Sequence, residues 1–428
     1  MRLLIATLAL ATMALALADH PPAAPGDVGP RPIIDAARYF DPHSPTSGLQ
    51  KAIDAAGPAG GVVAIPPGVY PLEQSLVLRS GVTLRGSGPA TVLRKEPGAV
   101  SPLAADCPAN ATEIQVSETA GFDVGGAIAL RDREQVGWYI THALVKSVRP
   151  GRIALDRPAS RDYRLDRGAV AVNFFPAITA NGQSALAIED LQIEGDLAHQ
   201  PAKAPSDFTL AAVHLVNCTR ARVRDVLVAG WPSDGIGVQG GSDVQVIGCQ
   251  AHRCRGHGFH PGTGLTGAVF TGNVARDNEW DGLFFCASVR QITVSANVFT
   301  GNAWSGIGGL GDDGDEWNTC SSNICADNGR AGIEFNDGRN NTATGNVCVN
   351  NSRSAPGRWA GIDIRNCTGC LVTGNRCADD QKQPTQHQGV REAGQSDHNV
   401  IASNHLYGSK KAVEKVGSHT RVAGEQGR

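Results

Sequence analysis

Ionisable side chains recur at one position of a pattern that repeats through the second half of the chain. The pattern is a glycine followed by an apolar residue, and in a strand the next side chain must point the opposite way from that apolar residue. We therefore align the residues two places after each glycine as one outward column. With the same frame one repeat earlier, the column reads His214, Gly237, His260, Phe284, Gly308, Glu334, Asp363 and Arg391. Two residues further along the strands, the same face carries Asn336 and Arg365.

Glu334 and Asp363 occupy neighbouring repeats, and adjacent strands lie about 4.8 Å apart, so we expect the two carboxyl groups side by side. Like charges this close need a shared proton or cation. In one chemistry they hold Ca²⁺, which neutralises a substrate uronate while Arg365 helps to remove the C5 proton. In the other, one carboxylic acid protonates a glycosidic oxygen and the second carboxylate attacks or activates water. A surface ion cluster, with Arg365 offsetting both acids, is the alternative without catalysis.

Histidines form a second group of candidates. His252, His257 and His260 lie within nine residues that also contain two arginines. His214 and His260 belong to the outward column, so each could act as a base or bind substrate. It is equally consistent with this pattern that the histidines only form a solvated wall of the groove and have no role in function.

Insertions around the same strand supply acidic and aromatic side chains. Asp312, Asp313, Asp315 and Glu316 lie in one short segment. Oxygen ligands of this kind suit a hard cation such as Ca²⁺, although the spacing is not that of an EF-hand loop, and a solvated acidic turn is the alternative. Trp317 and Trp359 lie in the insertions and could stack on sugar rings or simply anchor the loops. Such insertions on both sides of one strand stack predict a walled groove suited to an extended chain ligand.

The repeat that positions these residues is about 24 residues long. The glycines are 23, 24, 24, 26, 29 and 28 residues apart, and two asparagine series run in step with them. Apolar residues alternate inside each repeat, which indicates short strands, and one coil per repeat predicts a parallel β-helix. We expect the asparagines to accept left-handed turn geometry and to hydrogen-bond their copies in the next coil. The glycines are Gly235, Gly258, Gly282, Gly306, Gly332, Gly361 and Gly389; the asparagine series are Asn273, Asn297, Asn323, Asn346, Asn375, Asn404 and Asn278, Asn302, Asn328, Asn351, followed by Asp380.

Three segments give the chain a family resemblance. The phrases Val-Phe-Thr-Gly-Asn273 and Leu-Val-Thr-Gly-Asn375, and the entry segment between Leu49 and Gly86, resemble those of the right-handed parallel β-helix proteins of the pectate-lyase-like superfamily. The resemblance covers roughly residues 33–408 and implies that substrates bind along one parallel sheet. It implies less about activity, because one fold hosts many chemistries.

One shorter phrase resembles a motif of a β-helix enzyme family. Phe259-His260-Pro261-Gly262 is similar to the Phe-Asp-Pro-His signature of mannuronan C5-epimerases. His260 stands where that signature has Asp, and Gly262 stands where it has His. Epimerisation by the route of that family is therefore not expected.

The chain divides into five segments by composition and periodicity. Residues 1–18 have a basic start, an apolar run and a small-residue end, which is typical of a secretory signal peptide. We expect an N-terminal cap and first β-helix coils over 19–104, an inserted β module over 105–163, the main parallel β-helix over 164–408, and a C-terminal cap or tail over 409–428. Residues 46–56 should form an amphipathic helix that covers the open end of the coil.

Composition excludes several classes of protein. Glycine accounts for 52 of 428 residues, which is unfavourable for helical bundles. A formal net charge of −3 gives no support for nucleic-acid binding or a polybasic membrane anchor. The 11 cysteines do not show zinc spacing, and we expect Cys325, Cys348 and Cys377 to stack inside successive coils.

The sequence therefore predicts an all-β protein: a single-stranded right-handed parallel β-helix with an N-terminal capping helix and a small inserted β module. We expect a secreted or periplasmic protein, monomeric, that acts on a polysaccharide and not on nucleic acid or membranes. Lyase-type β-elimination on an acidic polysaccharide is the first expectation, with Glu334, Asp363, Arg365 and His260 as catalytic residues. A glycoside hydrolase and a non-catalytic carbohydrate-binding protein are the alternatives. Expected substrate-binding residues are His214, His257, Asn336, Trp317, Trp359 and Arg391.

Overall fold

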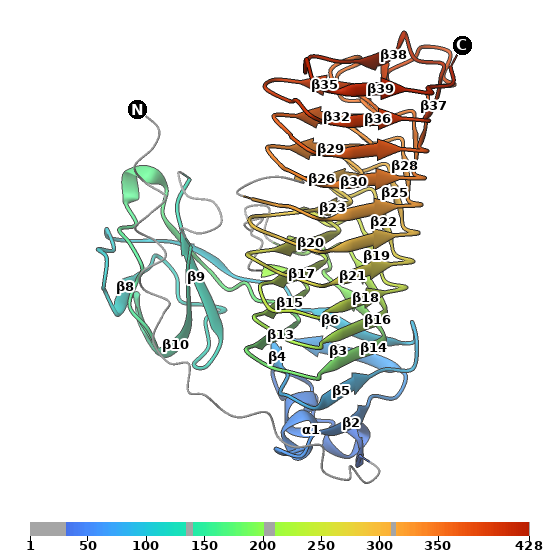
Figure 1. The fold of residues 1–428 in the computed structure, drawn as a ribbon. Helices are drawn as coiled ribbons and strands as arrows, with labels where there is room; N and C mark the ends of the chain where they lie inside the picture. Colours follow the sequence, from blue (N-terminus) through green and yellow to red (C-terminus); the bar gives the residue numbers. More distant parts are fainter. Residues whose placement is uncertain (1–30, 134–139, 201–209, 310–313, 428) are drawn as a thin grey trace, which may run out of the picture.

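Stacked coils of β-strand form the body of the protein (Figure 1). The computed structural model describes residues 31–133, 140–200, 210–309 and 314–427. The expected signal peptide over 1–18, and Asp312 and Asp313, lie outside the described residues. Among those residues, the coils contribute to two parallel sheets, of 11 and 22 strands.

The eleven-stranded sheet takes one strand from each coil and carries the outward column. Its strands pair in parallel, with Glu334 opposite Asp363 and Asn336 opposite Arg365, and Asp363 opposite Arg391. The alignment made from the glycine spacing is therefore confirmed. The strands are β4 (Leu76–Val77), β13 (Ile178–Asn181), β15 (Val213–Val216), β17 (Ile236–Gln239), β20 (Phe259–Gly262), β23 (Leu283–Phe284), β26 (Ile307–Gly308), β29 (Ile333–Asn336), β32 (Ile362–Arg365), β35 (Gln388–Ala393) and β38 (Lys411–Glu414).

The 22-stranded sheet takes two short strands from most coils and folds around the other side of the core. Its strands are β1 (Ile33–Asp35), β2 (Gly61–Ala64), β3 (Gly68–Leu72), β5 (Val82–Arg85), β6 (Thr91–Lys95), β14 (Ala187–Glu194), β16 (Arg222–Ala229), β18 (Gln245–Ile247), β19 (Gln250–His252), β21 (Val269–Thr271), β22 (Val274–Arg276), β24 (Thr293–Ser295), β25 (Val298–Thr300), β27 (Thr319–Ser321), β28 (Ile324–Ala326), β30 (Thr342–Thr344), β31 (Val347–Val349), β33 (Leu371–Thr373), β34 (Arg376–Ala378), β36 (Val400–Ala402), β37 (His405–Tyr407) and β39 (Arg421–Ala423).

The core lies inside the coils, between the two sheets. Inward residues of the eleven-stranded sheet, such as Ile307, Ile333 and Ile362, are fully buried. Cys325, Cys348 and Cys377 pair in register between β28, β31 and β34 and are also fully buried, as the sequence predicted. At about 25 cal/mol per Å² of apolar surface, this continuous column of buried residues is the main source of stability.

The asparagine series form two hydrogen-bonded ladders at the turns. In each step, one Oδ1 accepts from the backbone N–H and the side-chain amide of the preceding asparagine, as between Asn323 and Asn346 at 2.9 Å for both contacts. The left-handed residue is the one before the asparagine, for example Ser322 or Gly345, so the expectation that the ladder asparagines themselves adopt this geometry is wrong. This residue turns the chain, so that the asparagine side chain is free to bond along the stack.

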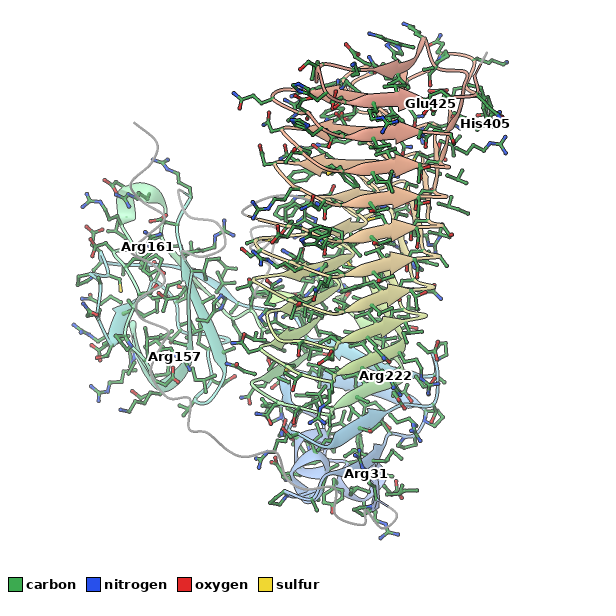
Figure 2. All side chains as sticks on the ribbon, in the orientation of Figure 1. Arg31, Arg157, Arg161, Arg222, His405 and Glu425 are labelled. Atoms are coloured by element: carbon green, nitrogen blue, oxygen red, sulfur yellow. The ribbon has the colours of Figure 1, made fainter. Side chains whose placement is uncertain are left out.

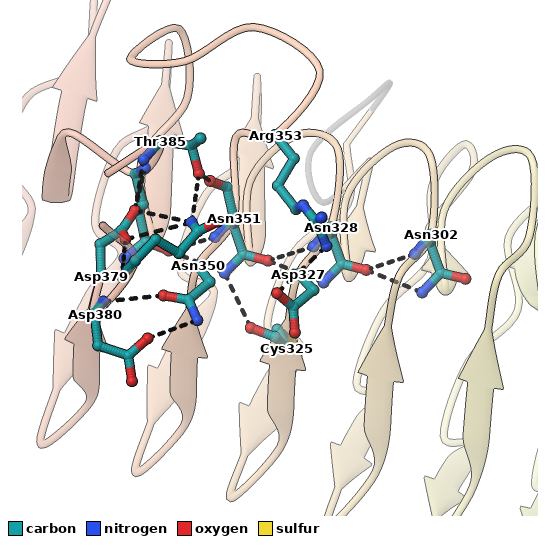
Figure 3. A network of polar contacts seen from close by, with 12 residues as sticks. Asn302, Cys325, Asp327, Asn328, Asn350, Asn351, Arg353, Asp379, Asp380 and Thr385 are labelled. Carbon is teal, nitrogen blue, oxygen red and sulfur yellow. Dashed lines mark hydrogen bonds and ion pairs between the residues drawn. The ribbon is translucent and has the colours of Figure 1, made fainter. Parts of the chain in front are cut away.

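The second ladder departs from the sequence prediction at its end. Asn302, Asn328 and Asn351 follow one another as expected (Figure 3). The next acceptor is Gln386, which bonds to the N–H and amide of Asn351 at 3.2 and 2.9 Å, and the assignment of Asp380 to this position is wrong. The exposed Asp380 instead accepts a bond from the half-buried Asn350 side chain, because the insertion after β34 carries the chain away before Gln386 returns it to the ladder.

A six-stranded, mainly antiparallel module interrupts the coils. It has its own apolar core, which includes Ile114, Leu130 and Ile153. The module sheet runs from Val100 to Val172, beyond both ends of the expected 105–163, because β7 and β12 pair with each other and β12 with β9. Its strands are β7 (Val100–Pro102), β8 (Glu113–Gln115), β9 (Ala127–Arg131), β10 (Thr141–Arg149), β11 (Arg152–Leu155) and β12 (Val170–Val172), with the 3₁₀ helix η2 (Leu165–Arg167).

The two ends of the stack are finished differently. Helix α1 (Leu49–Ala55) follows the 3₁₀ helix η1 (Ala36–Tyr39) and lies at the base of the coils (Figure 1), with Leu49 and Ile53 fully buried. The C-terminal segment adds another coil, since β38 pairs with β35 and β39 with β36. Within the described residues, no helix has the length and apolar character needed to cross a membrane.

Candidate functional site

A line of polar side chains crosses seven coils on the outward face of the eleven-stranded sheet. Half of its members come from the turns just before the strands and half from the strands themselves. We call this line the polar row. Its members are Asp234, His257, His260, Asp281, Ser305, Glu334, Asp363 and Arg391.

One end of the polar row is a buried aspartate–histidine pair. Asp234 Oδ2 lies 2.7 Å from His260 Nδ1, and Asp234 Oδ1 accepts the His257 backbone N–H at 2.6 Å. Burial lowers the pKa of His260, but the adjacent Asp234 carboxylate more than offsets this effect and raises it to about 10. Asp234 keeps its pKa below the usual value despite burial, because His260 and His257 face it. We therefore assign an imidazolium–carboxylate ion pair, which positions the turn rather than accepting protons at neutral pH.

His257 connects that pair to the next carboxylate. Its Nδ1 lies 3.2 Å from Asp281 Oδ2, and its ring stacks on Phe284 at 4.4 Å between centroids and 8° between planes. Asp281 Oδ1 in turn accepts the Ser305 N–H at 2.7 Å. The residue at the outward position next to Phe284 is Gly308, where a Cβ would lie 2.6 Å from Asp281 Oδ1. The missing side chain therefore makes room for the Asp281 carboxylate.

Glu334 lies on the other side of that glycine. Ser305 Oγ donates to Glu334 Oε2 at 3.0 Å, so a single serine bonds to both Asp281 and Glu334. Burial, together with the negative charges of Asp281 and Asp363, raises the pKa of Glu334 to about 7. Glu334 is only partly buried, whereas Asp281 and Asp363 are each 2% exposed. Glu334 is thus a partly accessible carboxyl group that exchanges its proton near neutral pH.

Asp363 is paired with an arginine of the next coil. Arg391 Nε lies 3.1 Å from Asp363 Oδ1, and its Nη2 bonds to Oδ2. Burial raises the pKa of Asp363, and the Arg391 guanidinium works against that rise. The expected neighbour Arg365 is exposed at the end of β32 beside the half-buried Asn336, so the ion-pair partner is Arg391, not Arg365. Strand alternation places Arg391 directly opposite Asp363, while Arg365 lies two residues further along.

Aromatic and guanidinium groups form a stacked band beside the polar row. Trp280 stacks on Trp304 at 5.2 Å and 11°, and the Arg330 guanidinium lies 3.8 Å from the Trp304 ring centre. Trp359 continues the band, with Arg358 4.8 Å from its ring. These residues precede successive strands of the sheet and are partly or fully exposed. The band offers flat apolar faces and positive charge on the same side as Glu334.

His214 lies apart from the polar row, near the inserted module. It is 8% exposed on β15 and lines a cavity of about 390 Å³ together with Thr179 of β13 and His142 and Arg157 of the module. The module therefore covers the outward face of the sheet at β13 and β15. A chain lying along the sheet from Glu334 meets this cover after about five strand spacings, or roughly 24 Å.

The described acidic residues after β26 make structural contacts. Asp315 is fully buried and its Oδ1 accepts the Val289 N–H at 2.7 Å. Glu316 lies between Arg290 and Arg339, at 3.1 and 2.5 Å. Trp317 is 59% exposed, in a left-handed turn just before β27, whereas Trp304 of the tryptophan band precedes β26. The carboxylates of Asp315 and Glu316 are therefore already bound to donors within the protein.

Carboxylates able to hold Ca²⁺ are also largely occupied within the polar row. Both Asp363 oxygens contact Arg391, and Glu334 binds a proton near neutral pH. Ca²⁺ requires six to eight oxygen ligands, and this pair offers few. A Ca²⁺ ion shared between Glu334 and Asp363, as expected from the sequence, would therefore have to replace Arg391 as the partner of Asp363.

Sequence reasoning missed Asp234, Asp281 and Ser305, which stand one residue before the repeated glycines. An alignment column at that position reads Asp234, His257, Asp281, Ser305, Ala331 and Ala360, so four consecutive polar residues were visible in it. Strand alternation does not predict these residues as part of the site, because it does not fix the direction of side chains in turns.

Sequence and structure comparisons agree on the fold. The family model described as "Right handed beta helix region" matches residues 177–314 and 211–358. The protein is a right-handed parallel β-helix. No curated protein sequence is significantly similar to it. The mannuronan C-5 epimerase AlgE6 A-module of Azotobacter vinelandii superposes on this β-helix with a TM-score of 0.62 at 16% identity, covering 92% of this chain and 99% of the other.

Two further solved structures resemble this β-helix. The AlgE4 A-module of Azotobacter vinelandii gives a TM-score of 0.59 at 16% identity, covering 91% of this chain and 100% of the other. An exopolygalacturonase of Thermotoga maritima gives 0.52 at 11% identity, covering 93% and 92%. At identities this low, the structural similarity establishes only a shared β-helix architecture. The chemistry of this protein has to be inferred from its own residues.

Proposed function

We propose that this protein hydrolyses glycosidic bonds in an acidic polysaccharide, with Glu334 as the proton donor. The observation that carries the proposal is the state of Glu334: a partly accessible carboxyl with a pKa of about 7, linked through Ser305 to a second carboxylate. A glycosidase needs a carboxylic acid that stays protonated near neutral pH beside one that is ionised. Glu334 meets the first part of that requirement, and the Asp281 carboxylate on the other side of Gly308, which accepts the Ser305 N–H, is the group we propose for the second.

The steps follow from this pair. Glu334 gives its proton to the glycosidic oxygen as the bond to the anomeric carbon breaks. Asp281 accepts a proton from the water whose oxygen attacks that carbon. Asp363, held by Arg391, stays a buried negative charge that maintains the raised pKa of Glu334. Asp281 then releases to solvent the proton that it took from water, and Glu334 takes up a proton from solvent, which restores both carboxyl groups.

The tryptophan–arginine band supports an acidic sugar chain as substrate. Tryptophan faces can stack on sugar rings, and guanidinium groups bind carboxylates with charge-assisted hydrogen bonds. Trp304 with Arg330, and Trp359 with Arg358, place both kinds of group before strands β26, β29 and β32, the second of which carries Glu334. Two of the similar structures are named as a mannuronan C-5 epimerase and an exopolygalacturonase, and these names are consistent with an acidic polysaccharide.

The β-elimination expected from the sequence is the second candidate. The exposed Arg365 beside Asn336 favours it, since a guanidinium there could assist removal of the C5 proton of a uronate. Glu334 would again protonate the leaving oxygen. Ca²⁺ dependence of this route stays a prediction.

Export and a monomeric state are part of the proposal. Residues 1–18 have the composition of a signal peptide, and a polysaccharide substrate is met outside the cytoplasm. One chain supplies every member of the polar row, so no second copy is needed for the chemistry.

The test is product analysis on a panel of polyuronates and neutral polysaccharides, with and without a calcium chelator. New reducing ends without the ultraviolet absorbance of an unsaturated uronate indicate hydrolysis, and that absorbance indicates elimination. Glu334→Gln should lose at least 100-fold in kcat, within the range of general acid catalysis. Glu118→Gln, an exposed change on the inserted module, is the matched control. Binding without any product, or full activity in Glu334→Gln, refutes the proposal.

A further inference from the structure

Two histidines and an aspartate converge at the C-terminal end of the β-helix. His398 lies two residues before Val400 of β36, and His419 lies two residues before Arg421 of β39. Val400 and Arg421 are paired, so the histidines hold equivalent positions in successive coils. Their rings stack with centroids 4.6 Å apart and 4° between planes.

Asp397 holds the two histidines together. Its Oδ2 lies 2.7 Å from His419 Nδ1 and 3.9 Å from His398 Nε2. Its Oδ1 accepts the backbone N–H groups of both histidines, at 2.8 Å from His398 and 2.7 Å from His419. The carboxylate is therefore fixed by two backbone bonds, which leaves Oδ2 directed at the imidazoles. Gly417 permits this approach, since a Cβ there would lie 2.6 Å from Asp397 Oδ1.

These three residues match what a zinc ion requires. Each offers one ligand atom, and the three atoms lie within 4.8 Å of one another. Zn²⁺ binds histidine nitrogen and carboxylate oxygen at about 2.0–2.2 Å, so ligand atoms on one tetrahedral ion lie about 3.3 Å apart. The observed separations of 2.7 and 3.9 Å bracket that value. Both histidine side chains are 65% exposed, so their rings can turn toward a common ion without displacing core residues.

We propose that Asp397, His398 and His419 form a Zn²⁺-binding site on the last two coils, with an open fourth position for water. The site is separate from the polar row and does not depend on the proposed catalysis. A terminal coil of a solenoid is supported by a neighbour on one side only. A metal ion bound by residues of two coils would therefore fasten the last coil to the one before it.

The test uses untagged, chelator-treated full-length protein titrated with ZnCl₂ by calorimetry. We expect one equivalent of Zn²⁺ to bind, and His398→Ala and His419→Ala each to weaken binding at least tenfold. His405→Ala is the matched control, because His405 is an exposed histidine near the same end of the stack (Figure 2) and should bind zinc as the wild type does. Zinc should also raise the melting temperature of wild type and His405→Ala, and not that of the double variant His398→Ala/His419→Ala.

Urea unfolding of each variant without metal checks that its fold is retained. The absence of saturable binding in the wild type overturns the proposal. Binding of unchanged affinity in the double variant also overturns it, and directs attention to the other group with suitable spacing, Asp234, His257 and His260.

Discussion

The raised pKa of Glu334 can be tested without knowing the substrate, through the stability of Glu334→Gln. A carboxyl whose pKa rises from 4.5 to about 7 on folding binds its proton more tightly in the folded state. The stability it contributes is fully present below pH 4.5 and is lost as pH rises through 7. Glutamine is neutral at every pH and can still accept the bond from Ser305. The variant should therefore become more stable than the wild type as pH rises.

The size of the effect follows from the two pKa values. Each tenfold change in proton affinity corresponds to about 1.4 kcal/mol, so the full change corresponds to about 3 kcal/mol. Part of this is already lost at pH 5, and the side chain is partly exposed, so the difference expected between pH 5 and pH 8 is about 2 kcal/mol. Neighbouring carboxylates titrate in both proteins, and comparing the variant with the wild type at each pH largely removes their contribution.

The assay is urea unfolding followed by tryptophan fluorescence at pH 5, 6, 7 and 8. The reasoning is supported if wild type and Glu334→Gln have nearly equal unfolding free energies at pH 5, and that of Glu334→Gln is about 2 kcal/mol higher at pH 8. Glu118→Gln should show no such trend. A difference between Glu334→Gln and wild type that is the same at every pH would refute both the raised pKa and the role of Glu334 as a proton donor near neutral pH.

Four further predictions concern other parts of the structure. Asp234→Asn removes the partner that raises the pKa of His260 to about 10. The stability from this pair is present below pH 6.5 and lost as pH rises through 10. The unfolding free energy of the variant, measured in urea, should therefore be about 3 kcal/mol lower than that of the wild type at pH 6, and this difference should shrink by pH 10. Asn323→Ala leaves the buried Val294 C=O and Asn297 N–H without their ladder bonds and should cost about 3 kcal/mol in unfolding free energy, against less than about 0.5 kcal/mol for the exposed Asn181→Ala. Gly308→Ala places a Cβ 2.6 Å from Asp281 Oδ1 and should lower kcat about 100-fold while circular dichroism stays native; wild-type kcat in this variant would contradict the position assigned to Asp281. Because the module covers the sheet at β13 and β15, chromatography of early digests should show short products of narrow size range, and an initial spread of long fragments would argue against a closed end.

The positions of the candidate acids were predictable because they follow from a regular strand stack. The glycine spacing fixed the register, and the register fixed Glu334 beside Asp363 and Asp363 beside Arg391. The choice of ion partner follows from the same register. Arg391 lies directly opposite Asp363, whereas Arg365 lies two residues further along, so Arg391 rather than Arg365 binds Asp363.

The turns limited prediction most. Asp234 and Asp281 come from residues before the strands, where side-chain direction depends on local backbone angles and not on alternation. The prediction for the end of the second asparagine ladder is wrong for a related reason. The insertion after β34 lengthens the chain between coils, so Gln386 takes the ladder position that even spacing assigns to Asp380.

The sequence by itself determined the parallel β-helix, because every coil repeats the same inward apolar residues, close-approach glycines and ladder asparagines at a nearly constant period. It also determined which face carries ionisable groups. Only the tertiary structure decided which of the turn residues meet the strand residues, because contacts such as Asp234–His260 and Ser305–Glu334 join residues 26 and 29 positions apart through side chains whose directions no repeat encodes. The stacking of His398 on His419 and the link from Asp281 through Ser305 to Glu334 are both of this kind.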